Sequence, residues 1–145
     1  KLKNEKYILV YGFLQQKNVY EYARKLGNKK NLKIFNVNTL IEDYFLDTDK
    51  YFWNVTPEDF LALIYYSQEV VTNSFHGLSF SLIFEKEGNS SSRMFDMVKL
   101  INLEDRILKD SNTILDSKIN YNEVKLELNK KIDESERYIE KFFYN

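Results

Sequence analysis

The chain has 145 residues, enough for one domain with a substantial core, and its hydrophobic and aromatic contents of 43% and 16% exclude a disordered protein. A formal net charge of −1 excludes the basic surface typical of nucleic-acid binding. The chain has no cysteine and a single histidine, His76, which argues against disulfides and against metal centres built from these ligands.

The first part of the chain predicts a strand–helix–strand unit. Residues 7–11 form a short run of β-branched and aromatic residues, which is typical of a buried strand. Residues 16–26 place apolar side chains on one face of a helix, and we expect Gly27 to end it. Residues 32–37 predict the next strand. The two strands should therefore be parallel and joined by a right-handed crossover.

The segment that follows is ambiguous until a second helix begins. Residues 39–45 fit a short helix, and the aromatic residues 51–53 fit a partly buried cluster better than a surface that stacks on a sugar. Thr56 and Pro57 then form the strongest helix start in the chain, because a capping hydroxyl precedes a proline at the first helical position. We expect this helix to end at about Tyr66.

Residues 69–86 carry the strongest functional signal. We expect a strand over residues 69–72 and a helix over residues 76–84, joined by polar side chains that can cap a helix. A strand-to-helix turn exposes backbone N–H groups and the positive end of the helix dipole, which suit an anionic ligand. His76 at this turn can bind such an anion or transfer a proton, and a purely structural histidine is the alternative.

The rest of the chain predicts mainly helices. We expect a loop over residues 88–92, a helix over residues 92–101 and a short turn over residues 103–108. Residues 121–143 predict one long amphipathic helix that covers the sheet, because its polar face mixes acidic and basic residues, unlike that of a membrane-surface helix. Strands that alternate with helices predict an α/β fold with a Rossmann-like, doubly wound parallel sheet.

Residues 70–84, Val-Val-Thr-Asn-Ser-Phe-His-Gly-Leu-Ser-Phe-Ser-Leu-Ile-Phe, resemble the signature of the polysaccharide pyruvyl transferase family. The flanking segments 56–64, 92–93 and 103–108 resemble the helix before the signature and the stretch after it. The likeness extends over residues 7–143. Members of this family are built from two Rossmann-like lobes in a GT-B-like architecture, and this chain resembles the C-terminal lobe alone.

The resemblance implies that residues 1–145 form a single lobe of an enzyme whose N-terminal lobe lies outside this sequence. One departure from the family pattern follows the helix at 76–84. The family continues there with proline and a strand, whereas this chain continues with Glu87-Gly-Asn-Ser-Ser-Ser-Arg93. We therefore expect a strand of the sheet to be missing, and a stretch of chain to be absent near residues 86–89.

The resemblance also implies a reaction and a location. The family transfers pyruvate from phosphoenolpyruvate to two hydroxyls of a sugar, which forms a cyclic ketal and releases phosphate. The expected acceptor is a bacterial cell-surface saccharide, an exopolysaccharide or cell-wall polymer, or its lipid-linked precursor. No cofactor is implied besides phosphoenolpyruvate as the donor substrate. We expect a cytoplasmic transferase that makes at most peripheral contact with the inner face of the membrane.

The resemblance assigns roles to several residues. His76 is the expected catalytic residue, either as a protonated ligand of the donor phosphate or as the general acid, and the sequence leaves both roles open. Asn73 and Ser74 are expected to bind the donor, and Gly77 to let the backbone approach it, with helix packing alone as the alternative for Gly77. Many relatives have arginine where Ser74 stands, so we expect Arg93 to supply that charge, with a surface arginine as the alternative.

Two other functions stay open at this point. A nucleotide-sugar-dependent glycosyltransferase of the two-lobe type shares the fold, although the acidic residue that often holds the ribose is not evident. A non-catalytic lobe that binds an anion or a partner is the third reading. Elsewhere in the chain, we expect Arg106 to form a structural ion pair with Glu104 or Asp105 instead of binding a ligand.

Overall fold

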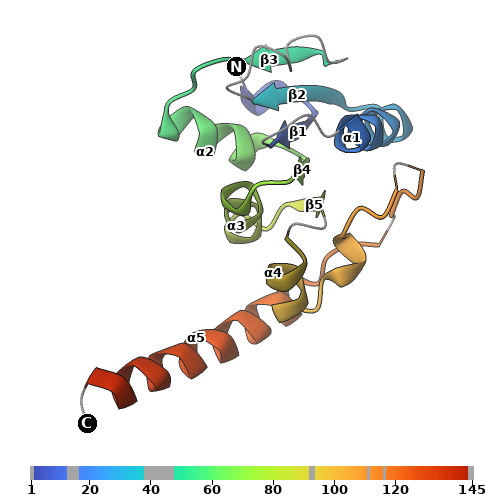
Figure 1. The fold of residues 1–145 in the computed structure, drawn as a ribbon. Helices are drawn as coiled ribbons and strands as arrows, with labels where there is room; N and C mark the ends of the chain where they lie inside the picture. The colour runs from blue at the N-terminus through green and yellow to red at the C-terminus, as the bar shows by residue number, and fades with distance from the viewer. Residues whose placement is uncertain are drawn as a thin grey trace.

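The computed structural model describes residues 2–12, 17–37, 48–91, 94–110, 112–115 and 117–143. Five parallel strands form one sheet in the order β3-β2-β1-β4-β5 (Figure 1). The strands are β1 (Tyr7–Tyr11), β2 (Lys33–Val37), β3 (Lys50–Phe52), β4 (Glu69–Thr72) and β5 (Glu87–Ser90). The helices are α1 (Lys17–Lys30), α2 (Pro57–Tyr66), α3 (Phe75–Ile83), α4 (Phe95–Leu100) and α5 (Tyr121–Phe143), with short 3-10 helices η1 (Leu2–Asn4) and η4 (Glu104–Arg106).

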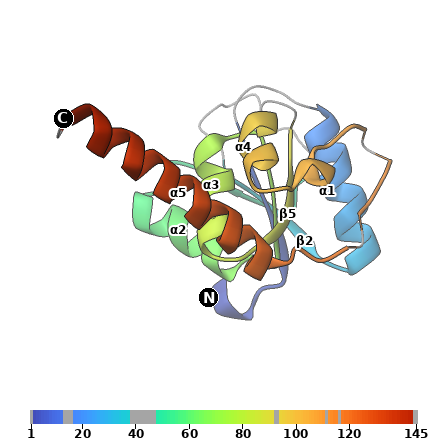
Figure 2. The same ribbon diagram turned by 90° about the horizontal axis from the view of Figure 1, so that it is seen from below.

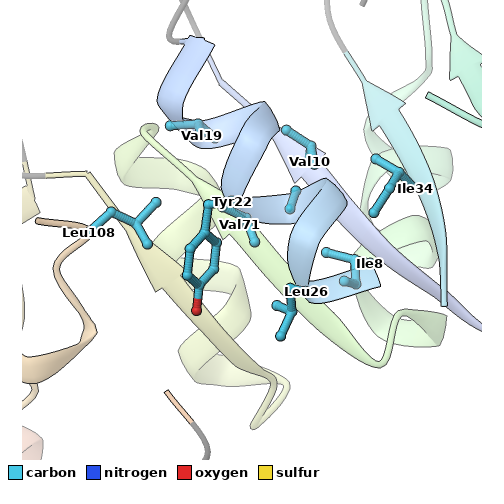
Figure 3. Packing of buried hydrophobic residues seen from close by; sticks show 9 residues of the cluster. Ile8, Val10, Val19, Tyr22, Leu26, Ile34, Val71 and Leu108 are labelled. Atoms are coloured by element: carbon cyan, nitrogen blue, oxygen red, sulfur yellow. The ribbon is translucent and has the colours of Figure 1, made fainter. Parts of the chain in front are cut away.

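Helices cover both faces of the sheet, which confirms the predicted α/β, Rossmann-like fold (Figure 1). Side chains of α1 pack on one face, and Figure 3 shows Tyr22 and Leu26 of α1 beside Ile8 of β1 and Val71 of β4. Helices α2 and α3 lie on the other face. Their side chains Phe60, Leu63, Ile64, Phe80 and Phe84 pack there with alternate residues of the strands, which are Tyr7, Leu9, Phe35, Val37 and Val70.

The central strand shows why the sequence folds in this way. Every residue from Tyr7 to Val10 is buried, because a parallel strand between two helical layers is covered on both faces. The Tyr7 ring stacks on Phe35 with 4.2 Å between ring centroids. Its hydroxyl donates to the carbonyl of Leu63 at 2.7 Å, which ties β1 to α2. Burial raises the pKa of the Tyr7 hydroxyl, so this donor stays protonated.

The strand order reverses direction at β1. From β1 the chain continues to β2 and β3 on one side, then returns to β4 and β5 on the other side. Tyr11 at the end of β1 is therefore paired with Val37 of β2 and with Thr72 of β4. In open parallel sheets, ligands bind outside the carboxyl ends of the strands at such a switch point.

The end of α1 differs from the prediction. The helix passes through Gly27 and ends at Lys30, followed by Asn31 in the left-handed region at φ 53°. The amide of Leu32 then donates to the carbonyl of Gly27 at 2.9 Å, as is typical of a helix C-terminus closed by a left-handed residue. Gly27 serves close packing instead, because a β-carbon there would lie 2.8 Å from the Leu32 carbonyl oxygen.

The expected loop over residues 88–92 is wrong for its first part, because residues 87–90 form β5. This strand pairs with β4, with Val70 opposite Gly88 and Thr72 opposite Ser90. The strand that we expected to be missing is therefore supplied by the chain directly after α3. Its sequence, Glu-Gly-Asn-Ser, lacks the β-branched residues that mark the other strands, which is why the pattern pointed to a loop.

The middle of the chain combines a confirmed helix with a strand that was not predicted. Thr56 caps α2 as expected, since its hydroxyl accepts from the amide of Asp59 at 3.2 Å. The aromatic residues before it belong partly to β3, where Phe52 contacts Phe35 with ring centroids 5.5 Å apart. Trp53, just after the strand, is 50% exposed. The predicted helix over residues 39–45 lies outside the described residues.

Two short elements follow β5 in the chain, α4 and η4. Helix α4 is shorter than the predicted helix over residues 92–101, whose first two residues are not described. The short turn over residues 103–108 is confirmed by η4. Arg106 is buried and donates to Glu87 at 3.4 Å and to the carbonyl of Ser117 at 2.5 Å, and it lies 3.7 Å from Asp105. The structural role expected for Arg106 is thus confirmed.

Helix α5 has the predicted length but does not cover the sheet. Its first turns pack on α3 and α4 through Val124, which is buried, and Leu128. Its later part extends beyond the rest of the chain in both views (Figures 1 and 2). The expectation of sheet cover is wrong because the apolar positions continue past the body of the domain: Ile132, Tyr138, Ile139, Phe142 and Phe143 are all exposed. Within the described part of the chain, no helix is long and apolar enough to cross a membrane.

Candidate functional site

The candidate site is the turn between β4 and α3, at the switch point of the sheet. Thr72, the last residue of β4, fixes this turn with two hydrogen bonds. Its hydroxyl donates to the carbonyl of Tyr11 at 2.5 Å and accepts from the amide of Ser74 at 3.0 Å. One side chain therefore ties the end of β1 to the beginning of α3.

Asn73 lies across the end of β1. It is 4% exposed, and a β-carbon at Gly12 would stand 2.1 Å from its carboxamide oxygen. Glycine at position 12 thus leaves the space that the Asn73 side chain fills. Asn73 is held inside the turn by the neighbouring strand and does not project into solvent.

The first turn of α3 leaves backbone donors free. The first intrahelical bond runs from the amide of Leu78 to the carbonyl of Ser74 at 3.0 Å. The amides of Phe75, His76 and Gly77 precede it, and no described residue accepts from them. These three N–H groups and the helix dipole form the kind of site that binds phosphates and carboxylates.

Ser74 adds a hydroxyl to this turn. It has the extended backbone of an N-cap residue, with φ −107° and ψ 136°, yet its side chain makes no capping bond. The side chain is 3% exposed, and its oxygen has no hydrogen-bond partner among the described residues. A buried hydroxyl without a partner costs about 1–3 kcal/mol, so this oxygen is available to a water molecule or a bound ligand beside the free amides.

His76 is exposed on the same turn, with its ring 6.2 Å from the ring of Phe75 in an edge-on arrangement. It stands at the second position of α3, where one of the free amides belongs to its own backbone. The imidazole can therefore reach a ligand bound at the helix start from the solvent side. A ligand there would contact the free amides and the Ser74 hydroxyl on its protein side and the His76 imidazole on its solvent side.

The structure thus places Asn73, Ser74, His76 and Gly77 in one turn at the switch point, as predicted, whereas Arg93 lies outside the described residues. The sequence interpretation missed Gly12 and the two-sided role of Thr72. A glycine directly after the first strand was the available signal for Gly12, because glycines often follow the first strand of such sheets. The bond from Thr72 to Tyr11 joins residues distant in sequence and left no local signal.

The fold and this turn define an α/β protein with a Rossmann-like parallel sheet and an anion-binding geometry at its switch point. No family model matches the chain, and no curated protein or solved structure matches it either.

Proposed function

We propose that this chain is the donor-binding lobe of a polysaccharide pyruvyl transferase, and that the start of α3 binds phosphoenolpyruvate. One observation carries the proposal. The segment that resembles the family signature forms a helix start with three free amides, the buried hydroxyl of Ser74 and the exposed imidazole of His76. Phosphoenolpyruvate carries a phosphate and a carboxylate, the two groups that a helix N-terminus binds best.

The proposed reaction joins both hydroxyls of the acceptor to one carbon of the donor. A proton adds to the methylene carbon, which becomes a methyl group, and positive charge develops on the central carbon. The first sugar hydroxyl attacks this carbon and gives up its proton to a base. The bond between that carbon and the phosphate oxygen breaks, and the second hydroxyl attacks the same carbon. One hydroxyl proton thus balances the proton on the methyl group, and the other leaves with phosphate.

Two roles suit His76 in this reaction. As a protonated ligand, it would hold the donor phosphate beside the amides of Phe75 and Gly77. As a general acid, it would deliver the proton to the methylene carbon. The two roles differ in kinetics. Loss of a ligand raises KM for phosphoenolpyruvate with a small change in kcat, whereas loss of the acid lowers kcat.

The other parts of the proposal concern groups beyond this turn. The carboxyl edge of the sheet would face a second lobe, which would bind the saccharide acceptor, free or attached to a lipid. Arg93 remains the candidate for the guanidinium that many relatives carry at the position of Ser74. An Arg93→Ala variant should therefore raise KM for phosphoenolpyruvate.

The test is acceptor-dependent release of phosphate from phosphoenolpyruvate by the full-length protein. We expect release by the parent and a fall in kcat/KM for phosphoenolpyruvate in His76→Ala, of at least about 100-fold if His76 is the general acid, the lower range for removal of an acid–base group. Ile83→Ala is the matched control, because Ile83 is exposed at the other end of the same helix. It should leave the rate unchanged.

Two results would contradict the proposal. Equal rates in the parent and His76→Ala would remove His76 from the reaction. Binding of a nucleotide sugar, with no phosphate release from phosphoenolpyruvate for any cell-surface saccharide, would replace pyruvyl transfer by glycosyl transfer.

A further inference from the structure

Buried polar atoms without a partner gather near the carboxyl ends of the strands. Among the described residues, these include the hydroxyls of Ser74, Ser90 and Ser91 and the side-chain carboxamide nitrogen of Asn36. Native proteins satisfy nearly all buried polar groups, and exceptions concentrate at functional sites. The hydroxyls at the end of β5 extend this set beyond the turn that begins α3.

Ser91 lies directly beside the candidate site. Its amide donates to the carbonyl of Thr72 at 3.0 Å, and this bond belongs to the last pair of the ladder between β4 and β5, Thr72 with Ser90. Ser91 and Asn73 are therefore the residues that directly follow this last pair, Ser91 after β5 and Asn73 after β4. The carbonyl of Ser91 accepts from the amide of Met94 at 3.0 Å, so the backbone of Ser91 is fixed on both sides.

Because side chains alternate along a strand, Ser91 and Ser90 are assigned to opposite faces of the sheet. Asn89 faces α1, because its side-chain oxygen accepts from the Tyr22 hydroxyl at 2.9 Å. Continued one residue past β5 and β4, the alternation assigns Ser91 to the same face, together with Asn73, which follows Val71 by two residues and lies against Gly12. This assignment places Ser91 and Asn73 together at the carboxyl ends of β5 and β4.

Ser90 projects from the opposite face. It lines a cavity of about 20 Å³ between the sheet and α3, together with Leu78 and Leu82. This volume fits one water molecule, which can satisfy the Ser90 hydroxyl. Ser91 is 5% exposed, and its hydroxyl has no partner among the described residues.

We propose that Ser91 is a second donor-binding residue, whose hydroxyl donates to an anionic oxygen of phosphoenolpyruvate held at the start of α3. The inference rests on the proposed function for the identity of the ligand. It assigns to the end of β5 a part of the site that the family signature around His76 does not include. The donor then lies across the ends of β4 and β5, between Ser74 and Ser91.

Titration calorimetry of the full-length protein tests this assignment, with phosphoenolpyruvate and inorganic phosphate as the two probes. Ser91→Ala should weaken phosphoenolpyruvate binding at least about tenfold, as expected for a lost hydrogen bond to a charged group. The melting temperature of Ser91→Ala should stay the same or rise, because the substitution removes a hydroxyl that makes no hydrogen bond to the described residues. An equal loss for inorganic phosphate would place the hydroxyl on the phosphate, and a loss confined to phosphoenolpyruvate would place it on the carboxylate.

Ser90→Ala is the matched control, since it removes the neighbouring buried hydroxyl from the opposite face. It should bind phosphoenolpyruvate as the parent does. The inference is overturned if Ser91→Ala binds as tightly as the parent, if both variants lose affinity equally, or if the parent binds neither probe. If the parent releases phosphate from phosphoenolpyruvate and Ser91→Ala binds phosphoenolpyruvate as tightly as the parent, this inference alone is refuted. Weaker binding by Ser91→Ala without turnover in the parent would refute pyruvyl transfer alone.

Discussion

Gly77 lies so close to Thr72 that a β-carbon at position 77 would stand 2.4 Å from the Thr72 hydroxyl oxygen. The same β-carbon would stand 3.0 Å from the ring of Tyr11. The first turn of α3 is thus pressed against the ends of β4 and β1. This contact fixes the three free amides over the switch point of the sheet, where the proposed donor binds.

Gly77→Ala tests this contact, because the contact decides whether the substitution raises or lowers the free energy of unfolding. In an open helix position, alanine would stabilise the protein by about 1 kcal/mol relative to glycine. Because the β-carbon meets Thr72 and Tyr11, we expect instead a loss of about 1–3 kcal/mol in the free energy of unfolding. Urea denaturation measures the difference, and a stabilised variant would show that α3 does not lie against the strands as described.

Gly88→Ala tests the register of β5. A β-carbon at Gly88 would lie 2.0 Å from the carbonyl oxygen of Val70, which is backbone and cannot rotate away. We expect a loss of about 3 kcal/mol, at the upper end of the range for over-packing. The same denaturation experiment applies. If residues 87–90 were a loop, the substitution would change stability by less than about 0.5 kcal/mol.

Arg106→Ala tests the ion pair below β5. The guanidinium is buried, and its removal takes the cationic donor from Glu87, which keeps the amide of Ile119, and a donor from the carbonyl of Ser117. We expect a loss of about 3 kcal/mol, as for a buried pair broken on one side. Lys125→Ala removes the exposed pair between Lys125 and Glu85 and should cost at most about 1 kcal/mol. Equal losses in the two variants would contradict the structural role of Arg106.

The hydrogen bonds of the Asp110 carboxylate lead us to expect a small pH dependence of stability. The amides of Asn112 and Thr113 donate to its carboxylate, at 2.6 and 2.8 Å, and these bonds hold its pKa below the usual 3.8. A carboxyl whose pKa is lower in the folded state stabilises the protein above its unfolded pKa, and this contribution disappears as pH falls through the folded pKa. Melting temperatures below about pH 4 should therefore fall less steeply in Asp110→Asn than in the parent. Identical slopes would mean that these bonds do not form in solution.

Much of the sheet could be predicted because its central strands are continuous apolar runs. Residues 7–10 and 70–71 are buried on both faces, and few other structures fit such short runs bounded by polar residues. The start of α2 was equally clear, since the Thr56 cap and the following proline act locally. The position of His76 at the strand-to-helix turn followed from the same local signals.

The features that were mispredicted depend on tertiary contacts. Gly27 is required by the closeness of Leu32 and Ile34, and its helix ends instead at Lys30, just before the left-handed Asn31. Residues 87–90 form a strand because β4 offers an open edge, although their own propensity is poor. The amphipathic pattern of α5 gave the length of the helix, but it could not show that only its first turns meet the domain.

The residues of the candidate site also divide into those that a local motif predicts and those that only tertiary contacts bring together. Asn73, Ser74 and His76 are adjacent in sequence, so a single motif predicts them together. Ser91 and Gly12 reach the same turn through the ladders of β5 and β1 with β4, and no sequence spacing indicates which residues those ladders bring together.

Amide chemical shifts of the full-length protein test the central claim most directly. Phosphoenolpyruvate is titrated into ¹⁵N-labelled protein while the backbone N–H signals of Phe75, His76 and Gly77 are followed. If the start of α3 holds the donor, these three signals move downfield and saturate together, with the dissociation constant found by calorimetry. Saturable binding that leaves all three signals in place would contradict the account.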